Sequence, residues 1–182
     1  MGVANAGPDQ GAIAHDDADG GARIDCKTIA GEELSNLVGE LVEARRRLNV
    51  TQVDLSGTLG ITPVSVSGWE ARHDLPTPIN LFLWARALGY AVAIADRSRR
   101  RYAARPAPRA DESPEQYWIR CVVLILRDIR QEANLTQAEV GRHLSVSTWT
   151  VHMWENMRRV PRISKLAEWC CVLDCRLILT TK

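Results

Sequence analysis

The sequence predicts a mainly α-helical protein made of two tandem copies of one small domain, each ending in a short strand. The first observation is an internal repeat: residues 41–88 align without a gap to residues 126–173, a shift of 85 positions. The second is the helical spacing of apolar residues within each copy. A unit that is longer than a solenoid repeat and occurs only twice indicates two domains of about 65 residues each. The matched pairs include Thr51-Gln52 with Thr136-Gln137, Trp69-Glu70 with Trp154-Glu155, Pro76 with Pro161 and Trp84 with Trp169.

The composition argues against several classes of protein. Hydrophobic residues make up 46% of the 182, which supplies the apolar helix faces that such small domains need. The sequence has no run of 18 uncharged apolar residues and no secretory signal at its start, so we expect a cytoplasmic protein with no membrane partner. An odd number of cysteines without a C-x-x-C pair argues against a disulfide framework. A metal site at Cys170, Cys171 and Cys175 is the alternative to small buried hydrophobes, which we expect.

The N-terminal segment differs in composition from the rest of the chain. Residues 1–27 are rich in Gly, Ala and Asp and have no apolar period, so they predict a disordered acidic tail. From Glu32 onward, apolar residues such as Leu34, Leu37 and Leu41 recur at helical spacing. We place the first domain at residues 28–96.

Helix starts are marked by capping residues at matched positions. Thr51-x-x-Asp54 and Thr136-x-x-Glu139 resemble capping boxes, and each predicts the start of a short second helix. A third helix is expected from Thr62-Pro63 in the first copy and from Ser147-Thr148 in the second. Thr77-Pro78 predicts a fourth helix that ends at Leu88-Gly89.

Each copy ends in a segment with the alternation of a β-strand. Residues 90–95 and residues 175–180 occupy the same place in the two copies. Because a single strand has nothing to pair with, we expect the two strands to pair with each other. The alternative is a homodimer that pairs these C-terminal strands between two chains.

Residues 97–113 are expected to be an Arg-rich linker. Six arginines and no acid fall within residues 97–109, together with two prolines and no helical period. Ser113-Pro114 then predicts the start of a long apolar helix, which opens the second domain at residues 114–182.

In each copy, the capped second helix, a tight turn and a third helix ending in Trp-Glu form a helix-turn-helix. The turn is Leu59-Gly60-Ile61 in the first copy. This unit resembles the XRE family, the DNA-binding domain of phage Cro proteins and λ-type repressors, over residues 33–89 and 118–174. The resemblance implies two tandem λ-repressor-like domains. It also implies buried ion pairs between the first and third helices, which would join Arg45 to Glu70 and Arg130 to Glu155.

The resemblance further implies how the unit binds DNA, because the third helix of the motif enters the major groove. The expected base contacts are Thr62, Pro63, Val64, Ser65 and Ser67 in the first copy, and Ser147, Thr148, Trp149, Thr150 and His152 in the second. The expected phosphate contacts are Gln52, Arg72, Gln137, Asn156, Arg158, Arg159 and Arg162. The expected base-reading positions hold no Arg, Gln or Asn, so the strong bidentate base contacts are missing.

The linker arginines are expected to contact a narrow minor groove between the two reading helices. They are Arg97, Arg99, Arg100, Arg101 and Arg105. The alternative is a solvated charge run that keeps the linker extended.

These features predict a sequence-specific regulator of transcription that binds double-stranded DNA near the nucleoid. We expect a repressor of phage or actinobacterial type that reads an asymmetric site, because the two third helices differ. The alternative is an antitoxin or interaction module with a protein partner, for which an exposed Trp149 would be the anchor. The sequence holds no nucleophile–base cluster, so we expect no enzyme, no cofactor and no metal.

Overall fold

The computed structural model describes residues 25–98, 101–102 and 106–181. The first copy of the repeat forms α1 (Cys26–Arg47), α2 (Gln52–Leu59), α3 (Pro63–Glu70), α4 (Pro78–Ala87) and β1 (Tyr90–Asp96). The second forms α5 (Pro114–Glu132), α6 (Gln137–His143), α7 (Thr148–Glu155), α8 (Ile163–Val172) and β3 (Cys175–Thr181). A two-residue strand, β2 (Arg101–Tyr102), lies between the copies. The fold is mainly α-helical and has two tandem helix-turn-helix units, as the sequence predicts.

Side-chain caps start the helices at the expected positions. Thr51 and Thr136 each form a complete capping box, with Asp54 and Glu139 as the reciprocal partners. Pro63 and Pro78 each occupy the first turn of a helix, where the absent N–H would have no partner in the helix. The start of α8 differs, because Arg162 precedes it without a side-chain cap.

Backbone turns repeat as faithfully as the helices do. Among the described residues, the eight positions with positive φ form four pairs that are each 85 residues apart. The pairs are Asn49 with Asn134, Gly60 with Ser145, Arg72 with Met157, and Gly89 with Asp174. A left-handed conformation is unfavourable for residues other than glycine. Its recurrence at matched positions shows that the fold requires these turns.

The two C-terminal strands pair with each other inside one chain. β1 and β3 are antiparallel, and β2 adds a third strand on the far side of β1. Ala93 pairs with Ile178, and these two residues are themselves matched positions of the repeat. Val92 pairs with Leu179, and Ile94 pairs with Leu177. The register is therefore symmetric, and a two-fold rotation about the central pair exchanges the two strands.

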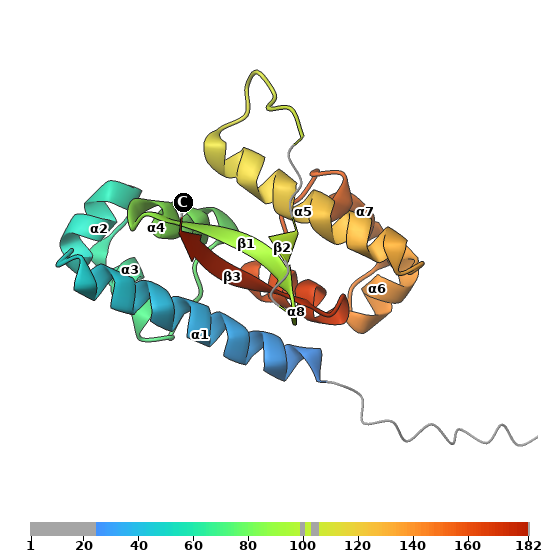
Figure 1. Ribbon diagram of the computed structural model, residues 1–182, viewed down its shortest axis with the longest axis horizontal. Coiled ribbons are helices and arrows are strands. Elements are labelled where there is room, and N and C mark those ends of the chain that lie inside the picture. Colours follow the sequence, from blue (N-terminus) through green and yellow to red (C-terminus); the bar gives the residue numbers. More distant parts are fainter. Residues whose placement is uncertain (1–24, 99–100, 103–105, 182) are drawn as a thin grey trace, which may run out of the picture.

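The helices extend this two-fold arrangement. α1 packs against α8 of the other copy, and α5 packs against α4 in the matched contact. Figure 1 shows the sheet at the centre, with α1 along one side of it and α5 along the other. One hydrophobic cluster includes buried residues from both copies. The cluster contains Trp84 and Trp169, matched tryptophans that are fully buried. The two copies therefore pack together into one unit and do not form two separately packed domains.

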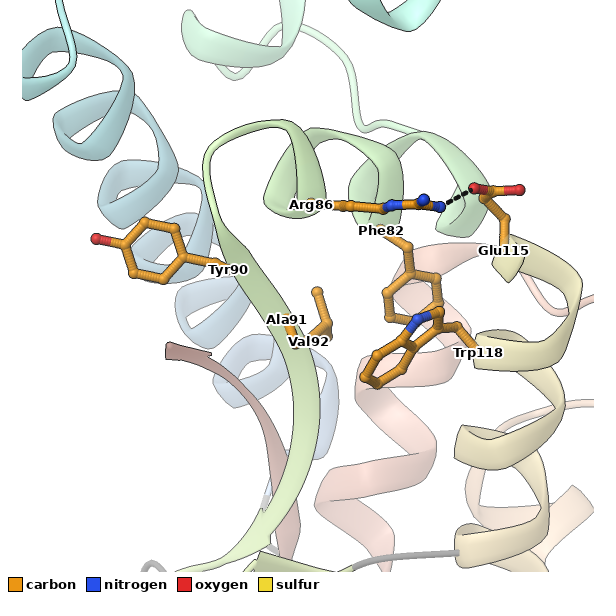
Figure 2. Close-up of a pocket in the computed structure, with 7 residues that line it drawn as sticks. All are labelled: Phe82, Arg86, Tyr90, Ala91, Val92, Glu115 and Trp118. Atoms are coloured by element: carbon orange, nitrogen blue, oxygen red, sulfur yellow. Dashed lines mark hydrogen bonds and ion pairs between the residues drawn. The ribbon is translucent and has the colours of Figure 1, made fainter. Parts of the chain in front are cut away.

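The contact between α4 and α5 is shown in Figure 2. Phe82 and Trp118 line the same small hollow, and Arg86 donates to Glu115 across the contact at 2.9 Å. The remaining hollow has a volume of about 20 Å³. A space of this size holds no more than a water molecule or so. It is a packing gap and not a ligand site.

Several features differ from the sequence predictions. α1 begins at Cys26, two residues inside the segment 1–27 assigned to the tail, because the Asp25 side chain caps it. The segment 97–113 is not simply a linker, because Arg101 and Tyr102 pair with β1. Its end is also held in place, since Arg120 bonds the Glu112 carboxylate and the Ala107 carbonyl. Strand pairing occurs within the chain and not, as in the alternative, between two chains. Residues 1–24 lie outside the described residues.

Candidate nucleic-acid interface

Each helix-turn-helix unit contains one bidentate ion pair, which joins its first helix to its third. Arg45 Nε donates to Glu70 Oε1 at 2.6 Å, and Arg45 Nη2 donates to Glu70 Oε2 at 2.8 Å. In the second copy, the same atoms of Arg130 and Glu155 are joined at 2.6 and 2.8 Å. Both ion pairs implied by the resemblance are thus present. Bidentate geometry fixes the angle between the first and third helices as well as their distance.

The same arginines also tie down the chain before the second helix. Arg45 Nη1 donates to the Val50 carbonyl, and Arg130 Nη1 donates to the Leu135 carbonyl, both at 2.7 Å. These carbonyls lie just before the caps of α2 and α6. One guanidinium in each copy therefore holds the first helix, the third helix and the entry to the second in one arrangement.

The charge state of Glu70 follows from its surroundings. Burial acts to raise the pKa of its carboxyl group, but hydrogen bonds from Arg45 and Gln52 outweigh this effect. The pKa of Glu70 is therefore lowered from its ordinary value. Arg45 and Glu70 therefore both stay charged at neutral pH, as an ion pair that holds two helices together requires.

Gln52 and Gln137, the expected phosphate contacts at the starts of α2 and α6, take part in this network. Gln52 Nε2 donates to Glu70 Oε2 at 2.8 Å, and Gln137 Nε2 donates to Glu155 Oε2 at 2.7 Å. Each amide is half-buried, and its nitrogen carries a second N–H. The carboxylate thus orients the amide at the N-terminus of its helix, where a phosphate would meet it. The sequence signal did not reveal this link to the ion pair.

The exposed face of α3 carries small side chains and has no charged or aromatic group. Thr62 caps the helix, and its hydroxyl lies 3.0 Å from that of Ser65. Val64 is 79% exposed, and Ser67 is exposed one turn later. Pro63 is exposed at the first position. This face offers the methyl groups of Val64 and the three hydroxyl groups of Thr62, Ser65 and Ser67 to a partner.

The exposed face of α7 is larger and richer in functional groups. Ser147 caps the helix, with its hydroxyl 2.9 Å from that of Thr150, and Thr148 is exposed at the first position. Trp149 is 65% exposed, and its ring stacks on His152 at a centroid distance of 5.4 Å. The two rings form one exposed aromatic surface on the helix.

Asn156, at the end of α7, extends this face. Its Nδ2 donates to the His152 carbonyl at 2.9 Å and lies 3.3 Å from the His152 ring. The surface of α7 is therefore a continuous row of aromatic and polar groups. The matched row on α3 is Val64, Ser67 and Ala71.

Basic groups gather in the loops that follow the third helices. Arg158, Arg159 and Arg162 are all exposed in the second copy. The first copy supplies Arg72, whose Nη2 contacts the Ser35 carbonyl on α1 at 3.4 Å. Arg72 therefore leans toward its own first helix, while the three arginines of the second copy have no hydrogen bond or ion pair of their side chains in the described part of the chain.

The two loops enclose a hollow that sequence reasoning did not anticipate. It has a volume of about 450 Å³ and is lined by residues 72–77 of the first copy and residues 162–164 of the second. The hollow arises because the two-fold arrangement brings the starts of α4 and α8 together. No motif in either copy could reveal it, because neither copy forms it alone.

Two of the five linker arginines lie within the described residues. Arg97 Nε donates to Asp174 Oδ1 at 2.5 Å and so joins the end of β1 to the turn before β3. Arg101 is exposed in β2. Arg99, Arg100 and Arg105 lie outside the described residues. Arg97 therefore has an ion-pair partner within the chain, while its side chain stays half-exposed.

The comparisons with known proteins agree with this geometry. The helix-turn-helix family matches the chain twice, at residues 41–94 and 126–179, which together are more than half of its length. No curated protein and no solved structure matches the chain. Within the described ranges, no cluster of His, Cys, Asp and Glu could hold a metal ion. No helix of that same part has the length and apolar character needed to cross a membrane.

Proposed function

The chain belongs to the XRE-type helix-turn-helix family and is a DNA-binding transcriptional regulator; from this premise we propose that it is a repressor that reads an asymmetric site. It acts by occupying a promoter, with no catalysis, in the cytoplasm at the nucleoid. An Arg-rich composition, with 20 of the 23 basic residues being Arg, fits a source of phage or actinobacterial type.

The observation that carries the proposal is the two-fold arrangement of two unlike recognition helices in one chain. A two-fold rotation that exchanges β1 and β3 also relates α3 to α7. Homodimeric regulators use this geometry to place identical helices in successive major grooves, about 34 Å apart. Here one chain contains two helix-turn-helix units related in a two-fold manner, as the two halves of a dimer are, but its two recognition helices present different side chains.

The two faces are expected to contribute unequally. α7 offers the Trp149–His152 surface and a set of exposed arginines beyond it, whereas α3 offers Val64 and hydroxyl groups. Apolar groups such as these contact thymine methyl groups, and hydroxyl and imidazole groups bond base edges. The second copy therefore supplies most of the sequence readout, and the first copy supplies mainly position and phosphate contacts.

Matched variants test this division. Trp149→Ala is expected to lower affinity for the selected site by about ten-fold or more and to relax base preference in one half-site. Val64→Ala, at the matched position of the repeat, is expected to lower it by less than about three-fold. Footprinting of the gene's own upstream region at physiological salt measures both. Equal effects on the two half-sites would contradict the unequal division.

The second candidate function, a partner-binding antitoxin, is favoured by one observation, the 65% exposure of Trp149. The salt dependence of binding separates the two functions. A repressor retains a protected site as salt rises, whereas a protein with phosphate contacts alone loses all binding. In that second outcome the Trp149 surface would be a protein-binding site, and the repressor proposal would fail.

A further inference from the structure

Two cysteines from different copies of the repeat meet at the contact between α1 and α8. Cys26 is the first residue of α1, and Cys171 lies near the end of α8. Their sulfur atoms are 2.7 Å apart, and both side chains are free thiols. A disulfide bond has a length of about 2.05 Å, so only a small approach separates this contact from a covalent bond.

The position of the contact gives it a structural consequence. Cys171 is matched in the repeat by Arg86, which joins α4 to α5 through Glu115. The same site in the fold thus links the two copies twice, once by an ion pair and once by a pair of thiols. Of these two links, only the thiol pair can be made covalent.

The two thiols also differ in a way that suits sequential oxidation. Cys26 is partly exposed, whereas Cys171 is buried. Burial and the contact with Cys26 raise the pKa of Cys171 to about 12. Cys171 therefore stays protonated and shielded, and Cys26 is the sulfur that a soluble oxidant reaches first.

We propose that Cys26 and Cys171 are a modification site at which a peroxide forms a disulfide that locks the two halves of the molecule together. In the first step the Cys26 thiolate attacks one oxygen of hydrogen peroxide; the O–O bond breaks, and the product is a sulfenic acid with hydroxide leaving. In the second step the Cys171 sulfur attacks the Cys26 sulfur, gives up its proton and displaces hydroxide. In total, two thiols and one peroxide yield one disulfide and two water molecules.

The cross-link closes a long loop, because the two residues are 145 positions apart. Loop closure restricts the unfolded chain, and a loop of this length is among the most stabilising. The cross-link also holds α1 on α8, and so keeps one spacing between the two helix-turn-helix units. This consequence does not depend on whether the protein is a repressor.

The test uses the full chain, reduced, desalted and treated with hydrogen peroxide. Free thiols are expected to fall from the five of the reduced protein to three. Trypsin then yields the peptide of residues 24–27 joined to the peptide of residues 166–176, with the mass of two hydrogens lost. Fragmentation distinguishes Cys171 from Cys170 and Cys175, which lie in the same peptide. The thermal midpoint is expected to rise by about 10 °C and to return when dithiothreitol is added.

Two variants make the test decisive. Cys26→Ser changes a partly exposed side chain, so the protein is expected to fold but to lose both the cross-link and the rise in midpoint. Cys121→Ser, the control, retains them, because Cys121 lies on α5 and has no thiol in contact. Five free thiols after peroxide, a bridge to Cys170 or Cys175, or an equal midpoint rise in Cys26→Ser would each overturn the proposal.

Discussion

The two copies of the repeat have the same buried contacts but different residues on the exposed faces of their third helices. Their ion pairs, Arg45–Glu70 and Arg130–Glu155, have the same pairs of atoms at the same distances. The tryptophan pairs Trp69–Trp84 and Trp154–Trp169 have ring centroids 5.9 and 5.8 Å apart. By contrast, the exposed faces of α3 and α7 have no more than Ser or Thr in common. The fold constrains the buried residues of each copy. The exposed residues of each recognition helix are free to differ, and so is the partner that each helix contacts.

The turn between the second and third helices shows a finer difference. The first copy has Gly60 in the left-handed position, where the second copy has Ser145. The second copy has Gly141 on α6, where the first has the buried Ser56. A Cβ atom on Gly141 would lie 2.8 Å from the Val146 carbonyl oxygen. The two copies therefore form the same turn with glycine at different positions.

The largest effect is expected from breaking one ion pair. Glu155→Ala leaves the Arg130 guanidinium buried without its charge partner, at a cost of about 3–5 kcal/mol in the free energy of unfolding. Glu70→Ala is expected to act in the same way, because its carboxylate is almost as buried. Denaturant titration measures both. Glu43→Ala, which removes an exposed partner of Arg46, is the control and should cost less than about 0.5 kcal/mol. Equal costs at Glu43 and Glu155 would contradict the bracing role.

A smaller effect is expected at the turn of the second copy. Gly141→Ala forces the new methyl group, which lies on α6, against the Val146 carbonyl oxygen in the turn that follows this helix. We expect a loss of about 1–3 kcal/mol. Gly57→Ala, on α2, meets no atom within 4 Å and is expected to be neutral or slightly stabilising. If Gly141→Ala unfolds at the same denaturant concentration as the parent, the turn is looser than described.

Exchanging the residue at the left-handed position of the turn should change the stability of the protein in opposite directions in the two copies. Ser145→Gly relieves a backbone conformation that disfavours a side chain, and is expected to stabilise the protein by about 1 kcal/mol. Gly60→Ser introduces the same penalty in the first copy and is expected to destabilise by a similar amount. Thermal unfolding of the two variants checks the signs. Changes of the same sign would show that the two turns are not equivalent.

The smallest effect is expected in the dependence of stability on pH. The folded-state pKa of Glu70 is lowered, so its contribution to stability is present above the ordinary glutamate pKa of about 4.3. This contribution is lost as pH falls through the lower, folded-state value. Stability measured from pH 6 downward should therefore fall less steeply in Glu70→Gln than in the parent protein. Parallel curves would mean that the carboxylate does not gain from its partners.

The fold was predictable from the sequence where short-range chemistry decides it. Thr51, Thr62, Thr77 and Ser113 marked their helix starts, because a cap depends on a few neighbouring residues. The strand pairing was expected too, since neither strand has another partner in its own copy. What the sequence did not reveal were the other contacts between the copies, such as α1 with α8 and Arg97 with Asp174. These depend on how the helices of one copy pack on the other, which no local pattern encodes.

The candidate site was predictable to a similar depth. The ion-pair residues followed from the resemblance, but the hydrogen bonds from Gln52 and Gln137 to the same carboxylates did not. The exposed Trp149 was placed correctly on the third helix of the second copy, whereas its stacking on His152 depends on rotamers. The hollow between the two loops could not be predicted from either copy alone.

Selection of binding sites from a random pool of duplex DNA by the full chain tests the central claim most directly. The two unlike recognition helices of one two-fold body predict a selected site without palindromic symmetry. Its two different half-sites should have centres about 34 Å apart and bind one chain. A palindromic site that binds two chains would contradict the account, because it would mean that one kind of recognition helix reads both halves.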